Sequence, residues 1–422
     1  MIRFYNGKIA RFSPELRITD EEVWVEGNRI LYVGPRKAEN THFERQINLQ
    51  GDLLLPGFKN AHTHTQMTFL RSMADDMELE RWLQQLIWPA EAKLTEEAVY
   101  YLTKLGILEY LSSGITASFD MYNHTHTYLK ANREAGFRTV VCSAMNDFDK
   151  DITQIERDYN EACTDGSDLT SYILGIHAEY TTSVERMEYM ASLAEKYKSP
   201  CFLHLCETQE EVEGCIARYG ITPPQLIEKV GLFQYGGGGY HCCYMTEQDI
   251  DLFKRKGLYA VTCPASNLKL ASGIAPIEKM RKSGVKIAIG TDSPASNNAL
   301  DFFREMFLVT SLQKYLENNA TALPVEEVLK MACVNGADAM GLKDCNDIAE
   351  GKKADLIRID LSRPNMQPEN NILSNIVYSG SKDNIKMTMV NGKFLYENRE
   401  FFLDESTDYI YKKANEFVRS IK

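Results

Sequence analysis

Apolar, β-prone segments recur along the middle of the chain, separated by longer stretches with helical periodicity. They occupy residues 53–58, 115–122, 138–144, 172–180, 201–207, 239–245, 258–264 and 285–292. The stretch between the first two is typical of a helix, with Thr95 as the N-cap and Gly114 at its end. Eight strands alternating with helices over about 290 residues predict an α/β fold, a (β/α)8 barrel. A doubly wound parallel sheet also alternates in this way and is the alternative.

Both ends of the chain instead have short alternating apolar and polar segments, typical of strands in a solvated sheet. Pairs of one Asn and one Gly between such segments indicate hairpin turns, at residues 6–7, 27–28 and 391–392. We therefore expect residues 1–55 and 350–403 to form one small discontinuous β-sandwich domain. The barrel then covers residues 56–349, and residues 404–422 form a C-terminal helix.

The composition narrows the class of protein. The 422 residues are 44% hydrophobic and 25% charged, with a net charge of −12, as in an ordinary globular protein. The acidic balance argues against nucleic acid or an anionic membrane as a partner. No apolar run approaches the roughly 20 residues of a membrane span. The first residues lack a signal-peptide core, and the ten scattered cysteines indicate reduced thiols. We expect a cytoplasmic protein.

Polar residues gather at the ends of the predicted strands. In "GFKNAHTHTQM", His62 and His64 lie two positions apart, so in a strand both imidazoles point to one side. The ends of other strands carry His177, His204, Glu207, His241 and Asp292. Each alone is compatible with a core histidine or a helix cap. Together they indicate a site, because active sites of such barrels lie at the C-terminal ends of the strands.

The residue types point to a metal. His62, His64 and His204 would supply nitrogens and Asp292 an oxygen, a set that suits one Zn²⁺ per subunit, with iron or manganese possible. Glu207 would move protons, and His241 would orient the water or stabilise the oxyanion. This set predicts metal-assisted hydrolysis, in which the ion makes water a nucleophile near neutral pH.

The segments "LLLPGFKNAHTH", "HLCET", "YHCCYM" and "GTDSPASNNALDFF" resemble the mononuclear aminohydrolases of the amidohydrolase superfamily. The chain is most similar to the branch that contains 5-methylthioadenosine/S-adenosylhomocysteine deaminases and triazine chlorohydrolases. The resemblance covers essentially the whole chain. It implies the same fold and metal ligands, and a homodimer or higher homo-oligomer.

The resemblance also implies roles for substrate-binding residues. Glu91 matches a glutamate that binds ribose hydroxyls, and His177 matches a histidine that contacts substrate. Glu207 and Asp292 would contact the substrate as well. Ser266 and Asn267 would line the rim of the site, and Trp82 is interpreted as a core residue of an amphipathic helix.

One position departs from the deaminases of this branch. Ser143 stands where they carry an arginine suited to an anionic substituent, which disfavours S-adenosylhomocysteine as the substrate.

We therefore predict a zinc-dependent hydrolytic deaminase of an aminated purine nucleoside or related heterocycle, adenosine or 5-methylthioadenosine in type, with Glu207, His241 and Asp292 as catalytic residues. The alternative enzyme is a chlorohydrolase, or another displacing hydrolase, acting on a triazine or guanine-like ring. A non-catalytic scaffold would have lost these ligands. A two-metal site bridged by a lysine is disfavoured because residues 172–180 contain none.

Overall fold

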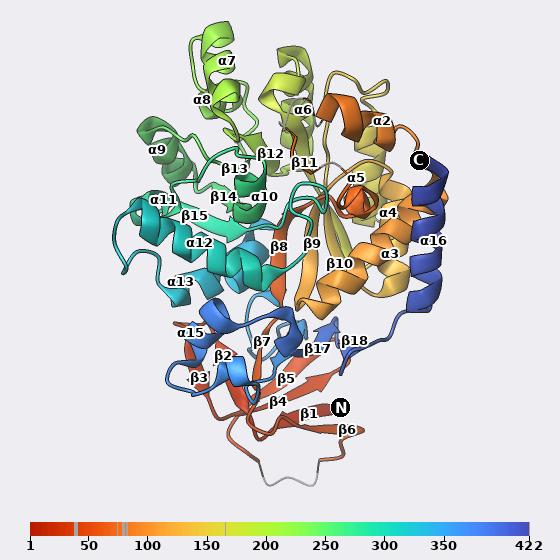
Figure 1. The fold of residues 1–422 in the computed structure, drawn as a ribbon, viewed down its shortest axis with the longest axis vertical. Coiled ribbons are helices and arrows are strands. Elements are labelled where there is room, and N and C mark those ends of the chain that lie inside the picture. Colours follow the sequence, from red (N-terminus) through yellow and green to blue (C-terminus); the bar gives the residue numbers. More distant parts are fainter. Residues whose placement is uncertain (38–40, 74, 78–80, 82, 165, 422) are drawn as a thin grey trace.

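The structure is a computed structural model that describes residues 1–37, 41–73, 75–77, 81, 83–164 and 166–421. Figure 1 shows a barrel of strands and helices with smaller sheets at one end, where strands from both ends of the chain lie. The C-terminal helix α16 (Thr407–Ile421) runs along the side of the barrel next to α3 (Glu96–Ser112). Sheets from both termini thus cover one end of the barrel.

The central sheet has eight parallel strands in sequence order, as predicted. They are β8 (Phe58–Thr63), β9 (Ile115–Met121), β10 (Arg138–Cys142), β11 (Thr170–Ala178), β12 (Cys201–Leu205), β13 (Gly237–His241), β14 (Tyr259–Thr262) and β15 (Lys286–Ile289). The last strand returns to the first, because Thr63 bridges Asp292 and the Asp292 N–H donates to the His62 carbonyl at 3.0 Å. The (β/α)8 barrel is confirmed, and the doubly wound alternative is wrong.

The predicted first strand, residues 53–58, is wrong. Leu53–Pro56 forms β7 of an end sheet, and the barrel begins with β8 at Phe58. Only Gly57 separates the two strands, and its N–H donates to the Asp355 carbonyl at 3.0 Å. Both strands are buried, so their apolar residues form one continuous run that cannot reveal where one sheet ends.

Helices follow most barrel strands. Besides α3, they are α4 (Thr125–Ala135), α5 (Gln154–Thr164), α6 (Val184–Tyr197), α7 (Gln209–Tyr219), α8 (Pro223–Lys229), α9 (Glu247–Lys256), α10 (Pro264–Lys269), α11 (Ile277–Ser283) and α12 (Phe302–Leu316). Shorter helices are α2 (Trp88–Glu91), α13 (Val325–Lys330), α14 (Gly336–Ala339) and α15 (Ile372–Ser374). The predicted N-cap of α3 is confirmed, since the Thr95 hydroxyl accepts from the Ala98 N–H at 3.2 Å.

Two further sheets come from the chain ends. One contains β1 (Ile2–Tyr5), β4 (Glu22–Glu26), β5 (Arg29–Gly34) and β6 (Arg45–Asn48). The other contains β7 with β2 (Lys8–Arg11), β3 (Arg17–Thr19), β16 (Leu356–Ile359), β17 (Ile385–Val390), β18 (Lys393–Glu397) and β19 (Glu400–Phe401). A shared apolar core that includes Phe4, Val23, Leu54 and Met389 joins them. The predicted domain limits stay a prediction.

Two of the three predicted hairpins are confirmed. The turn at residues 27–28 joins the paired strands β4 and β5, and the turn at 391–392 joins β17 and β18. The hairpin at residues 6–7 is wrong, because β1 and β2 belong to different sheets. The turn instead carries the chain from one sheet to the other, with Gly7 packed so closely on Leu49 that a Cβ would lie 2.4 Å from the Leu49 Cβ.

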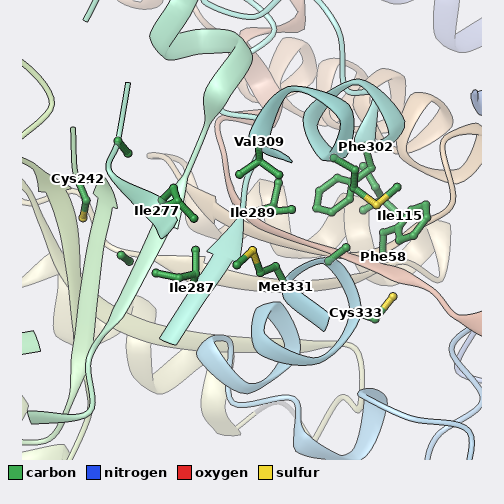
Figure 2. Packing of buried hydrophobic residues seen from close by; sticks show 14 of the residues in the cluster. Phe58, Ile115, Cys242, Ile277, Ile287, Ile289, Phe302, Val309, Met331 and Cys333 are labelled. Carbon is green, nitrogen blue, oxygen red and sulfur yellow. The ribbon is translucent and has the colours of Figure 1, made fainter. Parts of the chain in front are cut away.

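A continuous apolar core links the barrel to the sheet that contains β7. Figure 2 shows Phe58, Ile115 and Phe302 packed together, with Ile287, Ile289 and Met331 in the same cluster. The Phe58 and Phe302 rings are stacked with centroids 5.4 Å apart.

No helix among the described residues has the length and apolar character to cross a bilayer. The homo-oligomer and the cytoplasmic location stay predictions.

A buried ion pair crosses the same boundary. The Arg138 Nε on β10 donates to Asp355 beside β16 at 2.6 Å, and the Asn391 N–H donates to the same carboxylate at 2.7 Å. Both ionic side chains are essentially inaccessible to solvent. Arg138 alone would therefore be an uncompensated buried charge.

We expect Asp355→Ala to lower the free energy of unfolding by about 3–5 kcal/mol, because it leaves the buried guanidinium unpaired. The matched control is Asp251→Ala, which removes the partner of exposed Arg255 and should cost less than about 1 kcal/mol. Urea denaturation of both variants measures the difference. Equal losses would contradict the assignment of a stabilising role to the buried pair.

Candidate active site

The predicted site residues meet at the C-terminal end of the barrel. His62 lies on β8 and His64 directly follows it, while His177 lies on β11, His204 on β12 and His241 on β13. Glu207 follows β12, and Asp292 follows β15. A cavity of about 470 Å³ opens onto this end, and all of these residues except His62 line it. His62 is buried beneath the others, with no solvent exposure.

Four side chains bring their donor atoms together. Asp292 Oδ1 lies 3.6 Å from His62 Nε2 and 3.4 Å from His64 Nε2. His64 Nε2 lies 3.3 Å from His204 Nε2. Two ligands about 2.0–2.1 Å from a tetrahedral ion are about 3.3–3.4 Å apart, so this spacing fits the edges of a tetrahedral site.

Hydrogen bonds orient two of the imidazoles. His64 Nδ1–H donates to the Met121 carbonyl at 2.5 Å, and His204 Nδ1–H donates to the His177 carbonyl at 2.7 Å. These bonds place the proton on Nδ1 and leave Nε2 with a lone pair facing the shared centre. Burial lowers the pKa of both rings, which favours the neutral form that a metal ligand requires.

His62 gives the strongest sign of a missing partner. Its ring stacks on Tyr240 with centroids 3.8 Å apart, yet neither ring nitrogen has a hydrogen-bond partner. A buried polar atom without a partner is costly, and native proteins rarely contain one. The donor set of three imidazoles and one carboxylate therefore fits a divalent metal ion, and the cluster supports a metal at this place.

The backbone around these donors has unusual geometry. His241 and Asp292 have φ angles of 69° and 58°, in the left-handed region that is costly for residues other than glycine. Gly290, two residues before Asp292, packs against His62 so closely that a Cβ would lie 2.8 Å from the His62 backbone nitrogen. The close approach of these two strands therefore depends on glycine.

Glu207 is held in place by a second acid that the sequence interpretation missed. Both oxygens of Glu211 accept backbone hydrogen bonds, from the Cys206 N–H at 2.7 Å and the Glu207 N–H at 2.8 Å. The Ser272 hydroxyl donates to Glu207 Oε1 at 3.2 Å. The pattern T-x-x-E at Thr208–Glu211 could have indicated a carboxylate that turns back to the backbone at a helix start.

Burial raises the pKa of Glu207, although nearby His241 opposes the shift. Burial opposes charge on His241 too, but the carboxylates of Glu207 and Asp292 outweigh it and hold the His241 pKa above its usual value. The His241 Nε2 lies 3.8 Å from Glu207 Oε2. The two side chains are therefore coupled electrostatically.

The prediction that Ser266 and Asn267 line the rim is wrong. Both residues lie behind the site. Asn267 Oδ1 accepts from His241 Nδ1–H at 2.7 Å, and the Ser266 hydroxyl donates to Asp292 Oδ2 at 2.5 Å. Both are fully buried. The reason is that α10, which carries them, begins right after β14, so hydrogen bonds hold both side chains against His241 and Asp292.

Glu91 and His177 line the cavity, as expected for substrate-binding residues. The Tyr122 hydroxyl donates to Glu91 Oε1 at 2.5 Å, and burial raises the Glu91 pKa to about 7. Ser143, at the position of the expected arginine, lies outside the cavity lining, and its hydroxyl donates to the Gly175 carbonyl at 2.7 Å. Trp82 lies outside the described residues.

Comparisons with known proteins give a consistent result. A model of the amidohydrolase family matches residues 53–395. The chain is 37% identical over 401 residues to a 5-methylthioadenosine/S-adenosylhomocysteine deaminase of Caldicellulosiruptor saccharolyticus, which covers 95% of this chain and 89% of that protein.

Two solved structures are also similar. The crystal structure of an adenosine deaminase from Xanthomonas campestris with bound zinc matches with a TM-score of 0.94 and 32% identity, covering 100% of this chain and 98% of that one. The atrazine chlorohydrolase TrzN from Arthrobacter aurescens, complexed with zinc, matches with a TM-score of 0.90. It is 20% identical, covering 99% of this chain and 100% of that one, so it supports the fold alone.

We expect the purified protein to bind about one divalent transition metal, and His62→Ala to lower that occupancy strongly, because a buried ligand is lost. Adding Zn²⁺ to chelator-treated wild-type protein should stabilise it by about 4 kcal/mol at a free concentration 1,000 times the Kd. His126→Ala, an exposed histidine on α4, is the control. Elemental analysis and thermal unfolding measure both effects. Equal occupancy in the two variants would exclude His62 as a ligand.

Proposed function

The chain belongs to the amidohydrolase family, and we propose that it deaminates adenine nucleosides of the adenosine or 5-methylthioadenosine type. The predicted hydrolase acting on the C–N bond of a cyclic amidine is confirmed by the family match and by relatives that are deaminases. The observation that carries the substrate proposal is the cavity itself, in which Glu207 and His241 stand over the donor cluster and Glu91 lies on the wall.

We assign His62, His64, His204 and Asp292 as the ligands of a single ion, with Zn²⁺ favoured by the donor set. When bound, such an ion lowers the pKa of a coordinated water to about 7 and supplies a nucleophile at neutral pH. The three imidazoles are kept neutral by burial, so the Asp292 carboxylate is the one anionic ligand of the four.

Glu207 is the proposed proton donor to the substrate. Burial raises its pKa, although His241 opposes the shift, and a raised pKa favours the protonated form that a general acid needs. It would give its proton to the ring nitrogen next to the carbon that carries the exocyclic amine. Glu211, by binding the backbone N–H of Glu207, fixes the position from which this proton is delivered.

Asp292 and His241 complete the proton balance. Burial works to raise the Asp292 pKa, but His241, His64 and hydrogen bonds from Ser266 and Ser296 outweigh it, so the carboxylate stays ionised. It can accept the proton that the attacking water loses. His241, oriented by Asn267, can donate from Nε2 to the oxygen that is added to the ring. A proton returned to the amine then allows it to leave as ammonia.

Glu91 and His177 would bind the sugar. A carboxylate on the cavity wall can accept hydrogen bonds from two neighbouring ribose hydroxyls, which a triazine ring does not have. His177 Nδ1 contacts the Thr181 hydroxyl at 3.0 Å, which fixes the ring at the cavity edge. This contrast favours a nucleoside over the heterocycles that remain as alternatives.

An assay of ammonia release would test the proposal directly. Substrates are adenosine, 5-methylthioadenosine, guanine, and an amino- and a chlorotriazine, each with metal-loaded protein. We expect ammonia from the adenine nucleosides. Chloride release without ammonia would select the chlorohydrolase alternative, and ammonia from guanine alone would select a base deaminase.

Glu207→Gln should lower kcat for adenosine by about 10²–10⁴-fold, because the amide cannot transfer the proton, with metal content unchanged. The matched control is Glu210→Gln, an exposed glutamate on the following helix, which should stay within about threefold of wild type. Steady-state kinetics and elemental analysis check both. A kcat for Glu207→Gln close to that of the control would rule out the proton-transfer role.

The KM for adenosine should rise as the pH falls through 7. The Glu91 pKa of about 7 means that the ionised form, which accepts hydrogen bonds from hydroxyls, is lost below that pH. Between pH 8 and pH 6 the ionised fraction falls about tenfold, and the KM should rise by a similar factor. A 2′,3′-dideoxy analogue and the Glu91→Gln variant should both give flat KM profiles. A KM that rises equally for the dideoxy analogue would remove Glu91 from sugar binding.

A further inference from the structure

The cavity extends from an exposed mouth to the buried donor cluster. At the mouth, Phe148 is 72% exposed and Trp88 is 38% exposed, and their ring centroids lie 5.7 Å apart. Asp149, next to Phe148, also lines the cavity. At the inner end, His62 has no exposure. A nucleoside with its base at the donors would therefore direct the substituent at the far end of its sugar toward this mouth.

Asp149 is the carboxylate at the mouth, and the other lining carboxylates lie on the wall or at the inner end. None of the described residues that line the cavity is a lysine or an arginine, whereas Glu91, Asp149, Glu207 and Asp292 are carboxylates. Asp149 is half-buried, and its Oδ2 accepts from the Asn146 N–H at 2.9 Å, which fixes the carboxylate in the loop before α5.

Three cations among the described residues lie close to this loop or to the cavity. Lys150, next to Asp149, is exposed and lines a neighbouring cavity that shares Asp149, but it is not among the residues that line the active cavity. The other two are held elsewhere. Arg186 on α6 donates to the Asn146 carbonyl at 2.6 Å and to the Asp149 carbonyl at 2.9 Å, with its Nε 3.4 Å from Asp147. Lys269 on α10 donates to Asp75 at 2.6 Å and to the Ala295 carbonyl at 3.1 Å. Both cations thus stabilise loops and do not face the cavity.

We propose that the mouth of the cavity selects nucleosides whose distal substituent is neutral or cationic and discriminates against those that carry a carboxylate there. This inference rests on the proposed nucleoside deamination. A carboxylate at the mouth would meet Asp149 with no lysine or arginine among the described lining residues to pair with, and either repulsion or the loss of hydration would weaken binding.

A small apolar substituent meets the opposite conditions. A methylthio group can bury its surface against Trp88 and Phe148 without losing a hydrogen bond. An ammonium can lie over the same rings and near the Asp149 carboxylate. S-adenosylhomocysteine carries both an ammonium and a carboxylate, so its amino group is accommodated and its carboxylate is the group that the mouth opposes.

The test compares four substrates with metal-loaded enzyme. They are adenosine, 5-methylthioadenosine, S-adenosylhomocysteine, and the decarboxylated form of the last, which keeps the amine. We expect kcat/KM for 5-methylthioadenosine and for the amine to exceed that for S-adenosylhomocysteine by about tenfold or more. Added salt should reduce the deficit of the carboxylate-bearing substrate relative to the amine, because it screens exposed charges.

Asp149→Arg should reverse the preference. It should raise kcat/KM for S-adenosylhomocysteine about tenfold relative to 5-methylthioadenosine and lower that for the amine. The matched control is Asp151→Arg, which makes the same charge change two residues away, outside the active cavity. If the arginine variant does not fold, Asp149→Asn replaces it in the test, because it keeps a side-chain acceptor for the Asn146 N–H. We expect it to give a smaller shift in the same direction.

The outcomes separate the two proposals. If no adenine nucleoside releases ammonia, the proposed function fails. If adenosine is deaminated and S-adenosylhomocysteine is used as well as 5-methylthioadenosine, the selectivity inference alone is wrong. Equal shifts in the ratio for Asp149→Arg and Asp151→Arg would also overturn it, because they would trace the effect to overall charge.

Discussion

The contact between the first and last barrel strands is the constraint on which the site depends. The Asp292 N–H donates to the His62 carbonyl, and Thr63 bridges Asp292, so residues about 230 positions apart become neighbours. This closure places the carboxylate of Asp292 beside His62 on β8 and His64 just after it. Gly290 makes the approach possible, because any side chain there would collide with His62. Without closure, the four donor atoms would have no common centre.

Burial then sets the chemical state of the groups that closure brings together. The imidazoles are forced toward the neutral form, while neighbouring positive charge and hydroxyl donors keep Asp292 ionised. The same low-dielectric surroundings keep a proton on Glu207 over a wider pH range. Neighbouring groups are therefore shifted in different ways: the His62 and His204 imidazoles toward the neutral form, Asp292 toward the ionised form and Glu207 toward the protonated form. The unpartnered nitrogens of His62 indicate that the arrangement is complete only with an ion.

The sequence predicted the barrel, and the polar residues that meet at its C-terminal end, because both signals are local. Strand ends are marked by apolar runs that stop at His204 or Asp292, and the spacing of His62 and His64 follows from strand geometry. The boundary between β7 and β8 was missed because burial on both sides of Gly57 erases the alternation. Ser272 and the true place of Ser266 and Asn267 depend on contacts between distant segments, which no local pattern encodes. Glu211 differs, because it bonds the backbone of nearby Cys206 and Glu207 and its local T-x-x-E pattern was overlooked.

The direct passage from β7 into β8 has a mechanical consequence. One residue, Gly57, joins an end sheet to the barrel, and β16 returns the chain alongside β7 with four paired residues. Such a junction cannot act as a hinge, because rotation would break the ladder and the shared core at once. Substrate and product must therefore pass through the cavity mouth at the opposite end of the barrel, where Phe148 and Trp88 lie exposed.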